Sequence, residues 1–409
     1  MKNGRVGDTA NTIAVAIASL LIGAMVIVVA GCSPAPTAPD TGSVPVACVV
    51  ELTGAAAGAS QYPFATIQDY LDYFNEDQGI EGVTVELAWV DCRTQQASRV
   101  AAYHRFIEHN VPVMLMISGA EIFKTQAEKN EIPILGMAQT ESIMYPPGWI
   151  YSVYPTWAES FAVWCEWILK DWMETRPPRV TVIGPDAVAG APAIEPARDY
   201  VEAMGIEMLP TEYVSSYTPL DASTQLLRMA ERGTDFVFIA PIFTTAVPVL
   251  RDAERLGLKE TIQFGGLENT QSEGLLKASA GAADGYTAPR TNPFWKETDI
   301  PGIRLLQDLR QRYGRSVGFQ GDEANSLTGI AVVCEALKRA IDEVGYRNLE
   351  GRHVKEAMDG LKDFDIYGIK TITYTPDDHR GSTAVRIYRI RGADVIPVSE
   401  WAEAPMITP

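Results

Sequence analysis

Short apolar runs alternate with amphipathic segments along most of this 409-residue chain. Between residues 64 and 76, for example, Phe64, Ile67, Leu71 and Phe74 recur at spacings of three and four and so share one helix face. The runs that read as strands are residues 46–52, 83–90, 111–117, 132–137, 179–183, 207–214, 236–239 and 262–266. Such a strand–helix repeat predicts an α/β fold with parallel, doubly wound sheets.

The chain is too long for one ordinary core and fits two lobes. We expect residues 46–155 plus 287–370 to form lobe 1 and residues 156–286 plus 371–409 to form lobe 2. The chain would then cross between the lobes near residues 153–157, 285–290 and 369–375. Antiparallel strands around the turn-rich segment 375–381 would complete lobe 2. Because ligands of parallel sheets bind beyond the carboxyl ends of the strands, we expect a pocket between the lobes.

The N-terminus has the features of a secretory signal. Lys2 and Arg5 precede an apolar segment at residues 13–30. The segment ends in the sequence Val29-Ala30-Gly31-Cys32. Small residues running into a cysteine resemble a lipobox, the cleavage site of bacterial lipoproteins. Residues 1–31 would then be a lipoprotein signal peptide, with Cys32 as the lipidated first residue of the mature chain.

A transmembrane helix is the alternative interpretation, because the apolar segment reaches the lower limit for crossing a bilayer. The sequence after Cys32 favours the lipoprotein: Pro, Ser, Thr and Ala dominate residues 33–43, as in an extended, flexible tether. We therefore expect residues 32–45 to be a lipid anchor and tether that hold the protein on the outer side of a membrane.

Charge and motif content exclude several classes of function. The formal net charge of −18 argues against nucleic-acid binding, which requires clustered Lys and Arg. The four histidines are widely spaced, and no metal-ligand, nucleophile-elbow or phosphate-loop motif occurs. We therefore expect no enzymatic activity, no metal and no cofactor. The sequence around Cys48, Cys165 and Cys334 is typical of packed, unreactive cysteines. The sequence also allows one disulfide, but it does not show which cysteines would form it.

Three segments resemble the leucine/isoleucine/valine-binding proteins, which have the type I periplasmic binding fold and serve ABC importers of branched-chain amino acids. They are residues 46–62 (VACVVELTGAAAGASQY), 78–82 (QGIEG) and 91–97 (DCRTQQA). The similarity extends over residues 46–401. It implies two lobes that close on a small solute and then dock on an ABC permease.

The resemblance also implies the ligand-binding residues. It places the ligand's α-carboxylate on the loops with Ser118 and Gly119 and with Ala138 and Thr140, where free N–H groups attract an anion. It places the α-ammonium on Glu268 and an aromatic wall at Tyr62. Alternatives remain: Ser118 as a plain helix N-cap, Glu268 as a solvated loop acid, and Tyr62 as the cover of a core edge.

Several positions depart from the family pattern. Two tyrosines of the family pocket fall at Ala189 and Ile242, so the side-chain end of the pocket should be reshaped. Phe243 or Trp157 would fill part of that space, or pack in the core. Cys92 matches one half of a family disulfide, but the partner segment, residues 114–118, contains no cysteine. These departures make branched-chain specificity doubtful and leave an amino acid or a related carboxylate or amide as the expected ligand.

Two roles fit this interpretation. The first is a solute-binding lipoprotein of an ABC importer, with the solute, the permease and the membrane as partners. The second is a sensor of the same fold that reports ligand to a kinase, chemoreceptor or regulator.

Overall fold

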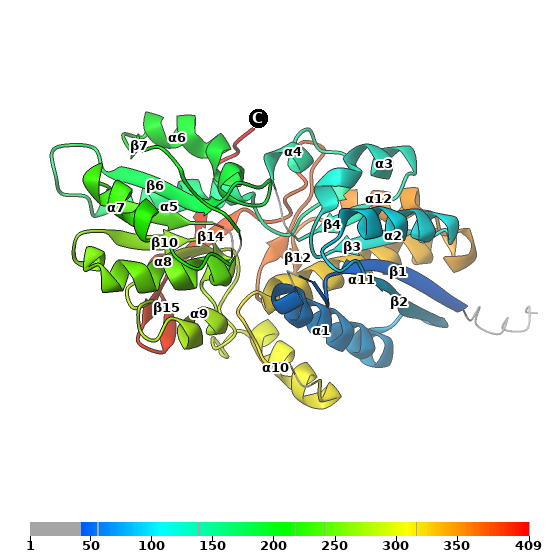
Figure 1. Cartoon of the computed structure of the whole chain (residues 1–409). Helices are drawn as coiled ribbons and strands as arrows, with labels where there is room; N and C mark the ends of the chain where they lie inside the picture. Colours follow the sequence, from blue (N-terminus) through cyan, green and yellow to red (C-terminus); the bar gives the residue numbers. More distant parts are fainter. Residues whose placement is uncertain are drawn as a thin grey trace, which may run out of the picture. The chain divides into compact units, whose positions relative to one another are not determined.

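The computed structural model describes residues 42–408 except 55–56, 138–139, 217, 241 and 316. The predicted signal peptide and Cys32 lie outside this range, as does most of the tether. The first sheet is entirely parallel and has the order β2-β1-β3-β4-β5 (Figure 1). Its strands are β1 (Gly42–Val50), β2 (Val83–Asp91), β3 (Val113–Met116), β4 (Ile134–Gly136) and β5 (Ile150–Tyr151).

Strand β1 shows why this sheet is covered on both faces. Successive side chains of a strand point to opposite faces, and β1 is apolar at nearly every position. Val46 and Cys48 enter one core, together with helices α1, α10, α11 and α12, whereas Ala47 and Val49 enter another, together with α2 and α3. A strand buried on both faces reads as a continuous apolar run, which is the pattern that predicted the parallel sheet.

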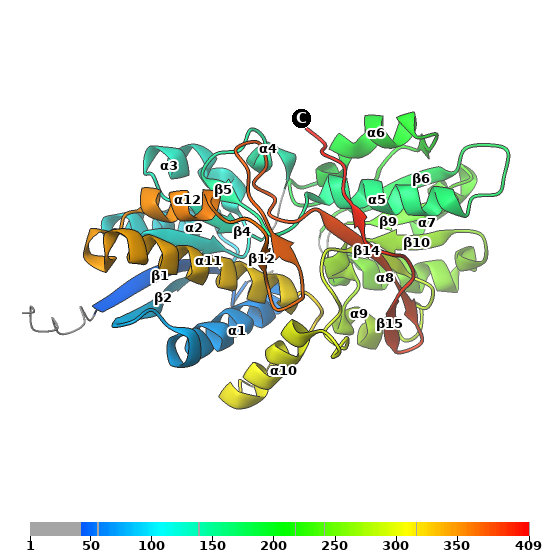
Figure 2. The same cartoon turned by 180° about the vertical axis from the view of Figure 1, so that it is seen from behind.

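The helices of lobe 1 come from two separate parts of the chain. Figure 2 shows α11 and α12 covering the side of the first sheet from which it is viewed. The lobe 1 helices are α1 (Ala57–Tyr73), α2 (Gln96–Glu108), α3 (Lys124–Lys129), α4 (Glu141–Met144), α10 (Pro301–Tyr313), α11 (Glu323–Val344) and α12 (Gly351–Asp359). The short antiparallel pair β12 (Phe364–Asp365) and β13 (Thr371–Ile372) packs on the same core.

The second sheet is parallel in its centre and antiparallel at one side. Its order is β15-β14-β11-β10-β9-β6-β7, with β8 also pairing with β6 and β16 with β14. The strands are β6 (Arg179–Pro185), β7 (Glu207–Met208), β8 (Glu212–Val214), β9 (Phe236–Ile239), β10 (Gln263–Gly266), β11 (Thr287–Arg290), β14 (Ala384–Arg391), β15 (Asp394–Pro397) and β16 (Ala402–Glu403). Strands β14 to β16 are the antiparallel finish expected from the sequence.

Helices also cover both faces of the second sheet. Val182 and Phe238 belong to one core with α5 and α6, and Ile183 and Ile239 belong to the other with α7, α8 and α9. These helices are α5 (Trp157–Lys170), α6 (Arg198–Ala203), α7 (Ser223–Glu231), α8 (Phe243–Arg255) and α9 (Glu273–Ala278). The predicted α/β fold with two doubly wound lobes is therefore confirmed.

The lobe boundaries differ from those predicted at two of the three crossings. Residues 287–290 were expected in lobe 1, but they form β11, which pairs with β10 and β14 of the second sheet. Residues 371–374 were expected in lobe 2, but Ile372 and Tyr374 pack in the core of lobe 1. The chain therefore crosses between β11 and α10 and again between β13 and β14, in both cases later than predicted. The crossing between β5 and α5 lies where it was expected.

Cys48, Cys92, Cys165 and Cys334 are all buried free thiols. The packed state expected for the first, third and fourth is therefore present, and Cys92 does not form the family disulfide. No helix within the described part of the chain is long and apolar enough to cross a membrane.

Candidate ligand-binding site

A pocket opens beyond the carboxyl ends of strands from both sheets. Ile117 follows β3, Met137 follows β4, and Glu268 follows β10, as parallel-sheet topology predicts. The space inside the pocket is about 880 Å³, a value that includes open solvent at its mouth. It is lined by Tyr62, Pro63, Ile117, Met137, Tyr154, Trp157, Ile242, Phe243, Glu268, Asn269, Ser272, Gln320, Asp322, Glu323, Asn325 and Ser326.

The pocket brings together three of the residues singled out from the sequence. Tyr62 comes from α1 in lobe 1, while Ile242 and Glu268 come from lobe 2. Phe243 and Trp157, the two aromatics considered as replacements for the missing tyrosines, line the same pocket. The aromatic content lost at position 242 is thus partly restored by the residue next to it.

The other predicted residues are not among those that line the pocket. Ser118, Gly119 and Thr140 lie on the expected loops after β3 and β4, and Ala189 lies in the turn after β6. Ala138 falls outside the described residues. Ser118 does not act as a side-chain N-cap: its hydroxyl accepts a hydrogen bond from Arg99 Nη2 at 3.3 Å, and Gly119 occupies the cap position.

Arg99 is held against these loops. Its guanidinium is largely buried and is paired with Glu51 at the end of β1. Gly119 adopts a left-handed conformation with φ 76°, and a Cβ at this position would lie 2.5 Å from Arg99 Nε. Glycine is thus required here for two reasons, its backbone conformation and the close approach of the arginine. The guanidinium of Arg99, paired with Glu51, therefore lies against the loop to which the resemblance assigned the ligand's carboxylate.

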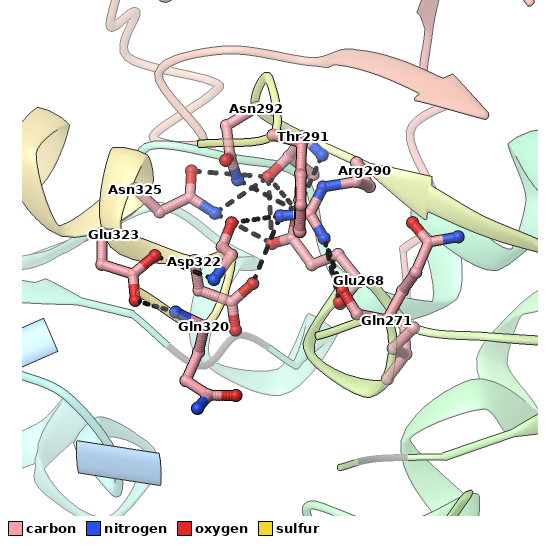
Figure 3. A network of polar contacts seen from close by, with 12 residues as sticks. Glu268, Gln271, Arg290, Thr291, Asn292, Gln320, Asp322, Glu323 and Asn325 are labelled. Carbon is pink, nitrogen blue, oxygen red and sulfur yellow. Dashed lines mark hydrogen bonds and ion pairs between the residues drawn. The ribbon is translucent and has the colours of Figure 1, made fainter. Parts of the chain in front are cut away.

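Glu268 is fixed by an array of donors from both lobes (Figure 3). Its Oε2 accepts hydrogen bonds from Thr291 N at 2.8 Å and from Asn292 Nδ2 at 3.2 Å. Thr291 Oγ1 donates to the same carboxylate, and Asn325 Nδ2 on α11 donates to Oε1 at 2.8 Å. The carboxylate therefore joins the loop after β10 to the next crossing and to a helix of lobe 1. It is not a solvated loop acid.

Arg290 stabilises the backbone around Glu268. It is fully buried and donates to the backbone carbonyls of Glu268 at 3.2 Å, of Gln271 at 3.1 Å and of Gly321. The guanidinium also lies over the ring of Phe294, 5.2 Å from its centroid. Arg290 therefore links the end of β11 to the start of α11.

Two ionisable groups beside Glu268 have strongly shifted pKa values. Burial raises the pKa of Asp322 to about 7, and the nearby charge of Glu268 adds to the shift. Burial lowers the pKa of Lys370 to about 7 although Glu268 opposes this shift. Lys370 Nζ donates to Asn325 Oδ1 at 2.8 Å and to Val153 O at 3.2 Å. Shifted groups clustered around a pocket are typical of functional sites.

The residues that surround Glu268 were not predictable from any local sequence pattern. Arg290, Asp322, Asn325 and Lys370 belong to no motif, and they come from different elements. Asn325 is 57 positions from Glu268 in the chain. The one available signal was the pair Asp322 and Glu323 directly before a long apolar helix, which reads equally well as an ordinary helix start.

The described lining of the pocket is acidic, amide-bearing and aromatic. Three carboxylates, several amides and four aromatic rings line it, and no Lys, Arg or His is among the described lining residues. Within the described residues, no group of His, Cys, Asp and Glu is arranged to hold a metal ion. A lining that combines carboxylates, amides and aromatic rings suits a small ligand with a polar, nitrogen-bearing end.

Solved structures show the same fold. A branched-chain amino-acid ABC transporter protein from Thermus thermophilus, solved with bound valine, is 22% identical; the match covers 89% of this chain and 97% of that one with a TM-score of 0.82. A fatty-acid ABC transporter substrate-binding protein from Thermomonospora curvata is 16% identical, with coverage of 91% and 96% and a TM-score of 0.79. A leucine-binding protein from Thermotoga maritima is 17% identical, with coverage of 87% and 98% and a TM-score of 0.72.

A sequence search of curated proteins finds no match. The family model described as "Periplasmic binding protein" matches residues 43–394, nearly all of the described chain. The match confirms the resemblance inferred from residues 46–62, 78–82 and 91–97, and it describes solute-binding proteins rather than enzymes. The chain belongs to the periplasmic binding protein family.

Proposed function

We propose that this protein is the solute-binding lipoprotein of an ABC importer and that it captures an amino acid or a related compound with an ammonium group. One observation carries the ligand class: Glu268 of lobe 2 and Tyr62 of lobe 1 line a single pocket. A carboxylate held by several donors is a ready partner for a cationic nitrogen. Family membership implies work outside the cytoplasm, and the valine found in the Thermus thermophilus relative supports an amino-acid-like solute.

The proposed mechanism is hinge closure. The solute first binds to lobe 1, with its carboxylate or amide carbonyl toward Ser118 and Thr140, and lobe 2 then brings Glu268 onto the ammonium. Bending at the three crossings would change the surface that both lobes present, and the permease would recognise the closed form.

Calorimetry on the purified full-length chain tests the ligand class. The panel is leucine, valine, arginine, leucinamide, phenylacetate and dodecanoate. We expect the amine-bearing compounds to bind with dissociation constants of about 1–100 μM and a negative heat-capacity change from apolar burial. Phenylacetate and dodecanoate, which lack a nitrogen for Glu268, should bind at least about tenfold more weakly. Binding of dodecanoate alone would contradict the proposal.

Metabolic labelling tests the membrane anchor at Cys32. Cells that produce the full chain should incorporate a palmitate analogue into the protein, and the Cys32→Ser variant should lose this label and stay at the size of the uncleaved precursor. A matched Cys48→Ser variant should keep the label, because Cys48 is a buried thiol in β1. Equal labelling of the parent and Cys32→Ser would show that lipid is not attached at this cysteine.

A further inference from the structure

The three carboxylates that line the pocket differ in how fully they are hydrogen-bonded. Both oxygens of Glu268 accept bonds from Thr291, and Asn292 and Asn325 add one each. Both oxygens of Glu323 accept backbone N–H groups, from Gln320 at 2.5 Å and Gly321 at 2.8 Å. Asp322 has one polar side-chain contact among the described residues, with Arg290 Nη2 at 3.5 Å. Of the three pocket acids it therefore has the most unused acceptor capacity.

Arg290 cannot complete this pair without breaking other bonds. A separation of 3.5 Å is at the outer limit of a hydrogen bond. The guanidinium is fully buried and already donates to three backbone carbonyls, which fix its position. The side chain of Asp322 is 34% exposed and so can be reached from the pocket. Its carboxylate also caps no helix, because α11 has no side-chain cap hydrogen bond at Asp322.

Amide oxygens on the same side of the pocket also lack donors. Asn269 lines the pocket, and its buried Oδ1 has no partner within the described chain. Asn292, whose Nδ2 donates to Glu268, also has an Oδ1 without a partner there, but this residue is fully buried and does not line the pocket. Free acceptors beside carboxylates call for a ligand that brings N–H donors.

Aromatic rings surround the remaining wall. Tyr62, Tyr154, Trp157 and Phe243 line the pocket, and their faces attract cations. No lining residue in the described part of the chain carries a positive side chain. A solute with equal positive and negative charge would add no net positive charge to this acidic lining, where Asp322 has only the long contact with Arg290 among the described residues.

We propose that Asp322 contacts the solute directly and that the pocket selects solutes of net positive charge, such as amino-acid amides, amines and basic amino acids. This inference rests on the proposed function and narrows it: Glu268 takes one cationic nitrogen, and Asp322 supplies a second negative charge close by. Asp322 is thus a specificity-determining residue of the pocket.

The protonation of Asp322 should make the affinity for a cationic solute depend on pH. Its pKa of about 7 in the free protein means that a cationic solute must displace a proton below that pH. Affinity should rise as pH increases from 5 to 7, a range in which an α-ammonium next to an amide, with a pKa of about 7.7–8.0, stays mostly protonated. The charged and titratable groups that face Asp322 are Glu268, Arg290, Glu323 and Tyr154, with Lys370 nearby. Of these, Lys370 also titrates near neutral pH, so a variant must separate the two groups.

Leucine and leucinamide form the matched ligand pair, because they share a side chain and an ammonium but differ by one negative charge. Calorimetry on the full-length chain should show leucinamide binding about tenfold more tightly than leucine. In Asp322→Asn we expect the leucinamide affinity to fall about tenfold and the leucine affinity to change less than about twofold. Asp308→Asn, which removes an exposed acid on α10, controls for net charge and should bind both ligands as the parent does.

Thermal unfolding confirms that the variants are folded. Asp322→Asn should unfold at an equal or higher temperature than the parent, since it removes a desolvated charge beside Glu268. The rise of leucinamide affinity between pH 5 and 7 should be lost in this variant. A parent that prefers leucine, or a variant that keeps the preference or the full pH slope, would overturn the assignment of Asp322. If no amine-bearing solute binds, the proposed function itself fails.

Discussion

Glu268→Gln should bind an amine-bearing solute about 100-fold more weakly than the parent protein. The substitution keeps the size of the side chain but removes the negative charge that the ammonium would meet. It also places an NH₂ group among donors from Thr291, Asn292 and Asn325. Calorimetry with leucinamide and leucine measures the loss of affinity, and urea unfolding should show a stability loss of about 1–3 kcal/mol.

Two further variants separate the charge from the hydrogen-bond array. Thr291→Val removes one donor to Glu268 but keeps the carboxylate, and Thr291 does not line the pocket. It should cost less than about tenfold in affinity. Glu260→Gln, on the surface of the same lobe, should bind as the parent does. If Thr291→Val weakens binding as much as Glu268→Gln, then the geometry of the array, rather than the charge of Glu268, determines affinity.

Arg290→Met should lower the free energy of unfolding by about 3–5 kcal/mol. Methionine fills much of the same space, but three backbone carbonyls lose a donor, and Asp322 loses its contact with the guanidinium. An unsatisfied buried polar group costs about 1–3 kcal/mol. Urea unfolding followed by tryptophan fluorescence measures the change, which should appear as a lower midpoint.

Arg304→Met is the matched control for this substitution. Arg304 also donates to backbone carbonyls, those of Thr298 at 2.7 Å and Asp299 at 3.0 Å, but it is exposed on α10. Water can replace the lost donor, so the cost should stay within about 0.5 kcal/mol. Equal losses in the two variants would mean that burial does not set the contribution of Arg290.

The alternation of apolar runs was sufficient to predict the two doubly wound sheets, because a strand covered on both faces needs apolar residues at nearly every position. Two features were not predicted in this way, namely strand β11 and the break between β7 and β8. The four residues of β11, Thr-Ala-Pro-Arg, contain a proline and an arginine and read as a crossing, yet all four are buried between β10 and β14. Residues 207–214 read as one strand, but Pro210, which lacks an N–H, separates β7 from β8.

The candidate site was partly predictable for a different reason. Tyr62 and Glu268 were found by resemblance to a family, and both line the pocket. Asp322, Asn325 and Lys370 meet Glu268 only through the packing of α11 and the last crossing, far along the chain. No local pattern encodes such a meeting. The roles of Ser118, Gly119, Ala138, Thr140 and Ala189 in binding remain predictions.

The donors around Glu268 have a consequence for the energetics of capture. Thr291, Asn292 and Asn325 immobilise the carboxylate before any solute arrives. The rotational freedom of this side chain is therefore lost on folding and need not be lost again on binding. Such preorganisation should make differences among solutes appear mainly in how long each one stays bound, rather than in how fast it enters.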